Sequence, residues 1–134
     1  MSPWWCNYIG LPFLKNGRGR EGLDCWGLGR LTYADNLGVD LPSFGGSYDV
    51  VNAGFEEQER LRDDVIKGWV DVTRTEHKAF DLIIFTLGGN PFHCAVVTKP
   101  GEMLHIMEGC NAVVESYTGR GWQRRLEGVY RYER

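Results

Sequence analysis

The sequence lacks the features that would place its 134 residues in a membrane or on a nucleic acid. No apolar run is long enough to cross a bilayer, so membrane insertion is not expected. The N-terminal stretch Met1–Trp5 has no basic segment followed by an apolar core, so we expect no secretory signal and synthesis in the cytoplasm. The net charge is −3 and no basic stripe is interleaved with aromatic residues, which argues against binding to nucleic acid.

Internal repeats and linkers are also missing, and the length suits one hydrophobic core. Hydrophobic residues make up 43% of the chain and charged residues 25%, which is typical of a folded globular protein. We therefore expect a single domain over residues 1–134.

Cysteine and histidine are both scarce. There is no Cys-x-x-Cys pair, so the usual spacing of a structural zinc site is missing, and we expect neither a metal nor a cofactor. Two disulfides could pair the four cysteines in three ways, but without a secretory signal free thiols are the expectation. The residues concerned are Cys6, Cys25, Cys94 and Cys110, with His77, His93 and His105 as the histidines.

The hydrophobic periodicity changes along the chain from a helical one to a period of two. It predicts helices over 25–37 and 54–67, with Gly38 as the stop of the first. A connector rich in Pro, Gly and Ser, 39–54, joins them. Strands follow at 69–72, 80–87, 92–98, 103–107, 112–116 and 127–132. Helices followed by an antiparallel meander indicate the α+β class.

A cysteine stands where the first helix begins. Asp24 is a preferred N-cap, because its carboxylate can accept hydrogen bonds from backbone N–H groups of the first turn. Cys25 then lies at the positive end of the helix dipole. We expect a lowered pKa for this thiol, and the thiolate is the nucleophilic form.

Two of the histidines lie in neighbouring predicted strands that a tight turn joins, whereas His77 lies in a charged loop and is expected to be exposed. His93 and His105 share a face of the sheet only if the numbers of paired residues add up to an even value. A plain two-residue loop at 100–101 gives an odd value. We therefore predict a loop of odd length or a bulge near Gly101.

If His93 and His105 share one face of the sheet, they can act together in catalysis. His93 can take the proton of Cys25 and later protonate a leaving amine, and His105 can orient His93. The alternative is a pair of core histidines satisfied by backbone partners. Cys94 alternates to the other face, so we expect it to be a small core residue.

Other residues leave two interpretations open. Arg18 and Arg20 are expected to be solvated loop charges, and the alternative is that they bind a substrate carboxylate. Trp4, Trp5 and Tyr8 could dock a partner protein or cover the core.

Several motifs resemble the NlpC-type cysteine peptidases, a papain-like family that cuts peptide bonds in bacterial peptidoglycan. They are Ile9-Gly10-Leu11-Pro12-Phe13, Gly22-Leu23-Asp24-Cys25-Trp26-Gly27-Leu28, Asp81-Leu82-Ile83-Ile84-Phe85, His93-Cys94-Ala95-Val96-Val97 and Leu104-His105. The resemblance implies Cys25 as nucleophile, His93 as base and His105 as the orienting residue. It also implies a Cys-bearing helix packed on a five- to six-stranded antiparallel sheet.

Two departures refine the resemblance. Asp-Cys-Trp-Gly replaces the Asp-Cys-Ser-Gly of free-standing cell-wall members, and Trp26 with the 122–131 ending resembles the phage-tail subgroup. Phe13 stands where the family often has a tyrosine, so a hydroxyl for the substrate or the oxyanion is missing. We assign Asp24, Trp26 and Phe13 to support of the substrate, the oxyanion or the helix cap.

The resemblance as a whole implies a stem-peptide endopeptidase carried by a phage tail or tail-like particle. Its partners would be tail-tip or tail-assembly proteins, and it would be located on the virion and act at the cell wall. One rival is a structural tail subunit with little or no activity. Another is an amidase or toxin with a substrate outside the wall.

Overall fold

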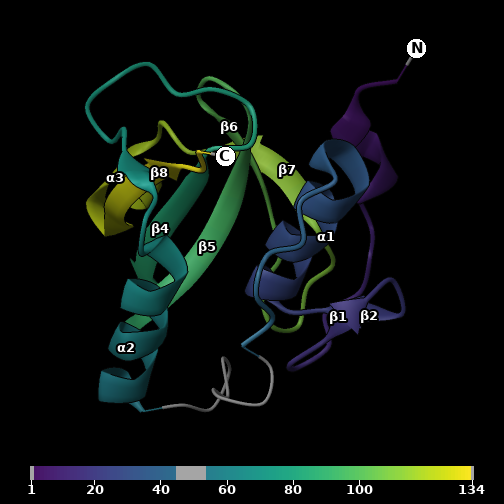
Figure 1. Cartoon of the computed structure of the whole chain (residues 1–134), viewed down its shortest axis with the longest axis horizontal. Helices are drawn as coiled ribbons and strands as arrows, with labels where there is room; N and C mark the ends of the chain where they lie inside the picture. The colour runs from purple at the N-terminus through teal and green to yellow at the C-terminus, as the bar shows by residue number, and fades with distance from the viewer. Residues whose placement is uncertain (1, 45–53, 134) are drawn as a thin grey trace.

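The computed structural model describes residues 2–44 and 54–133, so most of the predicted connector lies outside the described residues (Figure 1). The elements are η1 Trp4–Asn7, β1 Arg18–Gly19, β2 Gly22–Leu23, α1 Cys25–Leu37, α2 Phe55–Ile66, β3 Val70–Asp71, β4 Leu82–Leu87, β5 Asn90–Lys99, β6 Glu102–His105, β7 Val113–Ser116, α3 Arg120–Arg125 and β8 Leu126–Arg131. Six strands form one antiparallel sheet in the order β3-β8-β4-β5-β6-β7, and β1 pairs with β2 separately. The predicted α+β class and the six-stranded sheet are confirmed.

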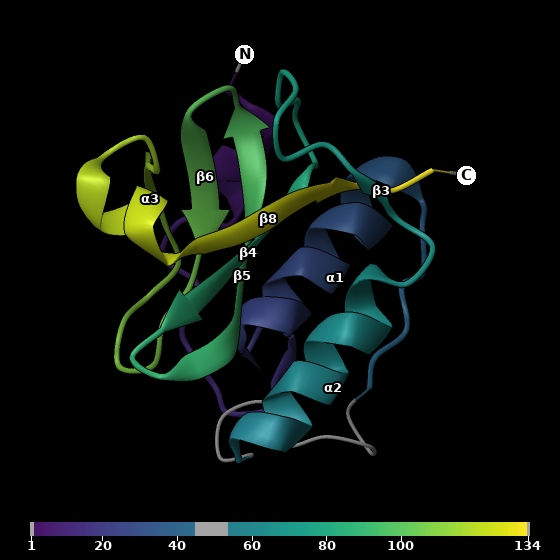
Figure 2. The same cartoon turned by 90° about the vertical axis from the view of Figure 1, so that its left-hand side faces the viewer.

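Helix α1 begins and ends where the sequence predicted. Asp24 caps its start, and Gly38 ends it in the left-handed conformation, with φ 65° and its N–H bonded to Ala34 O. Figure 2 shows the axes of α1 and α2 running in nearly the same direction, and Figure 1 shows the two helices standing apart on one face of the sheet. Leu28 of α1 and Leu61 of α2 are both buried in the same cluster as Ile84 of β4, so both helices cover this face.

The opposite face of the sheet is buried as well. Ile83 and Phe85 alternate with the helix-facing residues of β4 and pack with Val97 of β5 and Val129 of β8. Trp122 of α3 is partly buried and packs against this second cluster. A sheet covered on both faces can hold polar side chains away from water on either side.

The register between β5 and β6 meets the condition set for the histidines. Val96 pairs with Leu104 and Val97 with Met103, but Lys99 pairs with Glu102 across the two-residue loop. The shift leaves one extra residue, Thr98, on β5. The predicted bulge is confirmed, and it places His93 and His105 on one face.

The turn before β5 is shorter than predicted. Gly88 and Gly89 have φ of 58° and 81°, the conformation that a two-residue hairpin loop demands, and Asn90 already pairs with Leu87. Strand β5 therefore begins earlier and carries His93 well inside the sheet.

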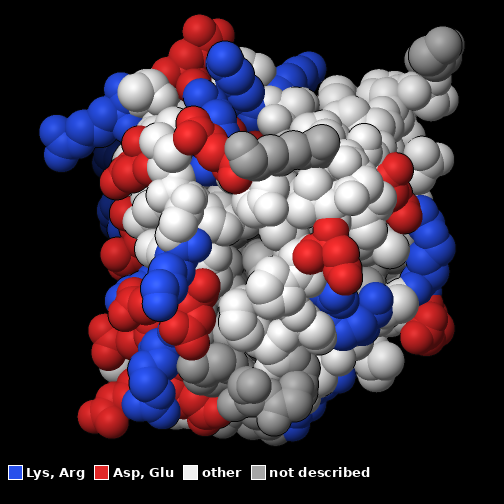
Figure 3. Space-filling model, viewed as in Figure 1, with Lys and Arg blue, Asp and Glu red and all other residues white. Residues whose placement is uncertain are grey.

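Charges of both signs are interspersed along the side of the molecule that α2 occupies in Figure 3, while the surface around the N-terminal segment at the upper right is largely uncharged. Among the described residues, no helix has the length and hydropathy that crossing a bilayer requires.

Candidate active site

A cavity of about 170 Å³ opens beside the start of α1. Phe13 and Asp24 line it together with Cys25 and His93. The remaining lining residues are Leu87, Asn90, Phe92 and residues 106–108. The cavity thus brings together the thiol and a histidine that are far apart in sequence.

Asp24 is a buried N-cap that is itself held by an arginine. Its Oδ1 accepts hydrogen bonds from Gly27 N at 2.7 Å and Arg18 Nη1 at 2.8 Å, and its Oδ2 has no partner among the described residues. Burial, together with the charge of Cys25, raises the pKa of Asp24 to about 6, against the opposing effect of Arg18. The cap predicted from sequence is confirmed.

The expectation for Arg18 was wrong. Its side chain is only 17% exposed, because it donates to Asp24, to Gly17 O and to Ser43 O and thereby ties the β1 loop to the start of α1. Arg20 fits its expectation better: its side chain is 51% exposed and pairs with Asp35 at 3.0 Å.

Cys25 is buried in contact with a second thiol and a histidine. A hydrogen bond with the Cys94 thiol, together with the hydrogen bond and charge of His93 and the backbone N–H of Cys94, lowers the pKa of Cys25 well below its ordinary value, against burial. Burial and the neighbouring Cys25 raise the pKa of the Cys94 thiol, which therefore stays protonated and donates. Cys94 does face away from His93, as predicted, but it also contacts the thiol of α1.

The histidines contact each other directly. His93 Nε2 lies 3.0 Å from His105 Nδ1, and the two rings are edge to face with centroids 5.3 Å apart. Both are buried, at 6% and 1% exposure. Their partners are side chains, so the alternative of core histidines satisfied by the backbone is wrong.

Sequence reasoning missed two residues behind His105. Glu115 Oε2 of β7 lies 2.6 Å from His105 Nε2, and Trp122 Nε1 of α3 donates to Glu115 Oε1 at 3.1 Å. Strand β7 was predicted, but its register against β6, with Met103 opposite Glu115, was not. An acidic residue on the strand after the one bearing His105 is the signal that could have found it.

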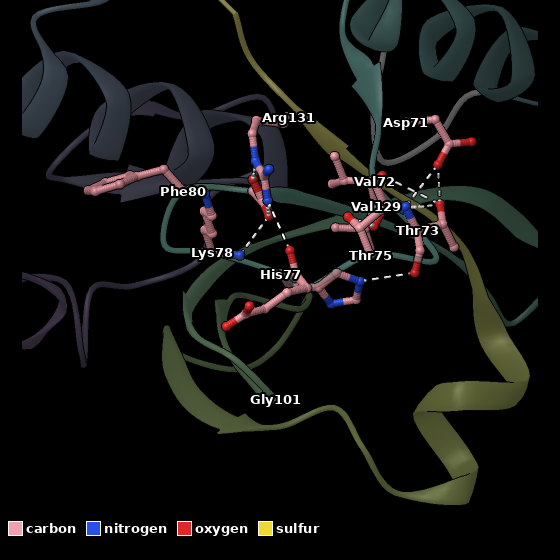
Figure 4. Close-up of polar contacts among 12 residues, drawn as sticks. Asp71, Val72, Thr73, Thr75, His77, Lys78, Phe80, Gly101, Val129 and Arg131 are labelled. Carbon is pink, nitrogen blue, oxygen red and sulfur yellow. Dashed lines mark hydrogen bonds and ion pairs between the residues drawn. The ribbon is translucent and has the colours of Figure 1, made fainter.

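His77 takes no part in this arrangement. Its Nε2 lies 3.1 Å from Thr73 O (Figure 4). Its Nδ1 lies 2.6 Å from Tyr117 Oη, so His77 is half-buried and not exposed as expected. In the same loop Asp81 pairs with Arg131 through both carboxylate oxygens at 2.8 Å. These contacts hold the loop before β4 and lie outside the cavity.

Of the three support residues, Trp26 lies apart. Its ring is 1% exposed and its indole N–H donates to Pro42 O at 2.8 Å, so it packs in the core and does not line the cavity. Phe13 lines the cavity with an apolar ring where a tyrosine would offer a hydroxyl. In the part of the chain that the structure describes, no three His, Cys, Asp or Glu side chains are grouped to hold a metal ion.

Known proteins resemble this chain in sequence and in fold. The murein DD-endopeptidase MepS/murein LD-carboxypeptidase of Escherichia coli strain K12 is 20% identical over 127 residues, which cover 95% of this chain and 58% of that protein. This chain thus spans little more than half the length of the curated relatives that it matches.

Solved structures share the fold. An NlpC/P60 family protein from Bacillus cereus superposes with a TM-score of 0.67 at 22% identity, over 93% of this chain and 36% of that one. The NlpC/p60 domain of the peptidoglycan hydrolase SagA gives 0.61 at 22% identity, over 95% and 92%. The model of the NlpC/P60 family matches residues 10–131. With nearly its whole length matched, this chain belongs to the NlpC/P60 family.

Proposed function

We propose that this protein is a cysteine endopeptidase that cuts the stem peptide of bacterial peptidoglycan and is carried by a phage tail or tail-like particle. The observation that carries the catalytic part is that Cys25 and His93 line one cavity, with His105 3.0 Å behind His93. Peptidoglycan as the substrate class is supported by two relatives, one named a murein DD-endopeptidase and the other a peptidoglycan hydrolase.

The reaction follows from this arrangement. His93 takes the proton of Cys25, and the thiolate attacks the scissile carbonyl carbon. Backbone N–H groups at the start of α1, including that of Cys25, hold the oxyanion. They do so without help from residue 13, because Phe13 has no hydroxyl to donate. His93 then protonates the leaving amine, and a water molecule, deprotonated by His93, hydrolyses the thioester.

Carriage by a tail rests on a different feature. The Asp-Cys-Trp-Gly sequence at the start of α1 resembles the tail subgroup, and Trp26 fills the core beside that start. We expect an antibody against the protein to detect it in purified phage or tail-like particles, together with tail-tip or tail-assembly proteins. Particles that lack it throughout would overturn this part of the proposal.

Activity is tested with purified peptidoglycan. The wild-type protein with its thiols reduced should release peptide fragments that mass spectrometry identifies, and Cys25→Ala should release none. Cys110→Ala serves as the matched control, since Cys110 is an exposed free thiol outside the cavity. If the wild type releases no Cys25-dependent fragment, the structural tail subunit becomes the better account.

A further inference from the structure

The hydrogen bonds behind His105 end in a carboxylate that is itself held in place. Glu115 uses one oxygen for His105 Nε2 at 2.6 Å and the other for Trp122 Nε1 at 3.1 Å. Trp122 also packs on both histidines: it stacks on His93 at 6.2 Å between centroids and meets His105 edge to face at 5.1 Å. The short helix α3 therefore brings one side chain that touches three members of the site.

The hydrogen bonds that link Trp122, Glu115, His105 and His93 have one consistent assignment of donors and acceptors. Burial acts to raise the pKa of Glu115, but hydrogen bonds from His105 and Trp122 outweigh it and lower that pKa, so the carboxylate is ionised and can only accept. His105 Nε2 must then carry a proton. Burial also lowers the pKa of His105, although Glu115 opposes this, so the ring is neutral and its Nδ1 has a lone pair.

That lone pair decides the state of the next ring. Because His105 Nδ1 accepts, His93 Nε2 must be the donor across their 3.0 Å contact. Before His93 accepts the proton of Cys25, its lone pair is therefore on Nδ1, the nitrogen not engaged with His105. Once it has accepted that proton, its charge favours the Cys25 thiolate.

We propose that Glu115, fixed by Trp122, is a positioning residue that sets the direction of the hydrogen bonds through His105 and His93 and so keeps Nδ1 of His93 free to take the proton of Cys25. Its effect on rate rests on the proposed peptidase function. The protonation pattern itself does not.

The opposite direction would disable the base. If His105 carried its proton on Nδ1, it would donate to His93 Nε2, and the proton of a neutral His93 would lie on Nδ1. A ring protonated there cannot accept the thiol proton, even with every atom in place.

Glu115→Gln tests the direction with almost no change of shape. The indole N–H of Trp122 can only donate, so it draws the amide oxygen and turns the amide NH₂ toward His105 Nε2. We expect the chain of hydrogen bonds to reverse. In assays with peptidoglycan fragments, kcat should fall by roughly 100-fold, the lower end of what a general base contributes, with KM unchanged.

A second substitution should undo the first. In Glu115→Gln/Trp122→Phe the indole donor is gone, so the amide can turn its oxygen to His105 and restore the original direction. We expect the double variant to regain roughly 10-fold in kcat over Glu115→Gln. Glu56→Gln, on the exposed first turn of α2, is the matched control and should leave kcat unchanged.

Side-chain 15N NMR reads the pattern whether or not the protein cuts peptidoglycan. In the wild type, His105 should be protonated on Nε2 and unprotonated on Nδ1, in Glu115→Gln this should reverse, and in the double variant it should return. An unchanged His105 tautomer in Glu115→Gln, or a double variant no better than that single one, would overturn the proposal. Wild-type protein that has the expected tautomers but releases no fragments would contradict the peptidase function alone.

Discussion

The thiol side and the histidine side of the site are built in different ways. On the thiol side, Asp24 and Cys25 are adjacent in sequence, and the local geometry of a helix start places both. On the histidine side, β5, β6, β7 and α3 each supply one residue, and those residues come together only because the sheet has the right register.

Burial differs only at the outer end of the histidine side. Asp24, Cys25 and both histidines are buried, whereas the Glu115 carboxylate behind His105 is 40% exposed. From this comparison we expect substitutions on the histidine side to change rate more than stability. Those around Asp24 should change stability more than rate.

Apart from loss of the Cys25 nucleophile itself, the largest expected effect is on the histidine side. His93→Ala removes the base and should lower kcat by about 10³- to 10⁴-fold, and His105→Ala, which removes only the orienting partner, should cost about 100-fold. Fragment release at saturating peptidoglycan measures both. Equal losses for the two variants would mean that His105 does more than orient.

Breaking the ion pair on the thiol side should instead lower stability. Arg18→Met leaves the buried Asp24 carboxylate without its cation and should reduce the free energy of unfolding by about 3 kcal/mol in urea titrations. Arg20→Met is the matched control: its pair with Asp35 is exposed on both sides, so its loss should cost below about 1 kcal/mol. Similar losses from both would show that Arg18 does not support the cap.

A smaller effect is expected at the second thiol. Cys94→Ala removes the donor that favours the Cys25 thiolate, so the pKa of Cys25 should rise and alkylation at neutral pH should slow by about 10-fold. Cys94→Ser keeps an O–H donor and should stay closer to the wild type. Equal rates for all three proteins would contradict a role for Cys94 beyond packing.

The same division explains what the sequence could predict. The cap, the helix over Cys25–Leu37 and its stop at Gly38 follow from neighbouring residues, and all are confirmed. The bulge near Gly101 was also predictable, because two histidines on adjacent strands can meet only with an even register.

Other parts of the site depend on contacts that a single sequence does not reveal. From sequence alone Arg18 is predicted to be a solvated loop charge, because its ion pair with Asp24 forms only when the β1 loop folds against the start of α1. Glu115 cannot be assigned to His105 from sequence, because their contact depends on the register of β7 against β6. The contact of Cys94 with Cys25 depends on how α1 packs on the sheet.

The central claim is that Cys25 is an activated thiol, and its alkylation rate against pH tests this most directly. The rate at Cys25, followed by mass spectrometry in the folded protein, should reach half its maximum at a lower pH than in the urea-unfolded chain. In His93→Ala that pH should move upward, since the hydrogen bond and charge of His93 help to lower the pKa of Cys25. A midpoint in the folded protein equal to or above that of the unfolded chain would contradict the account.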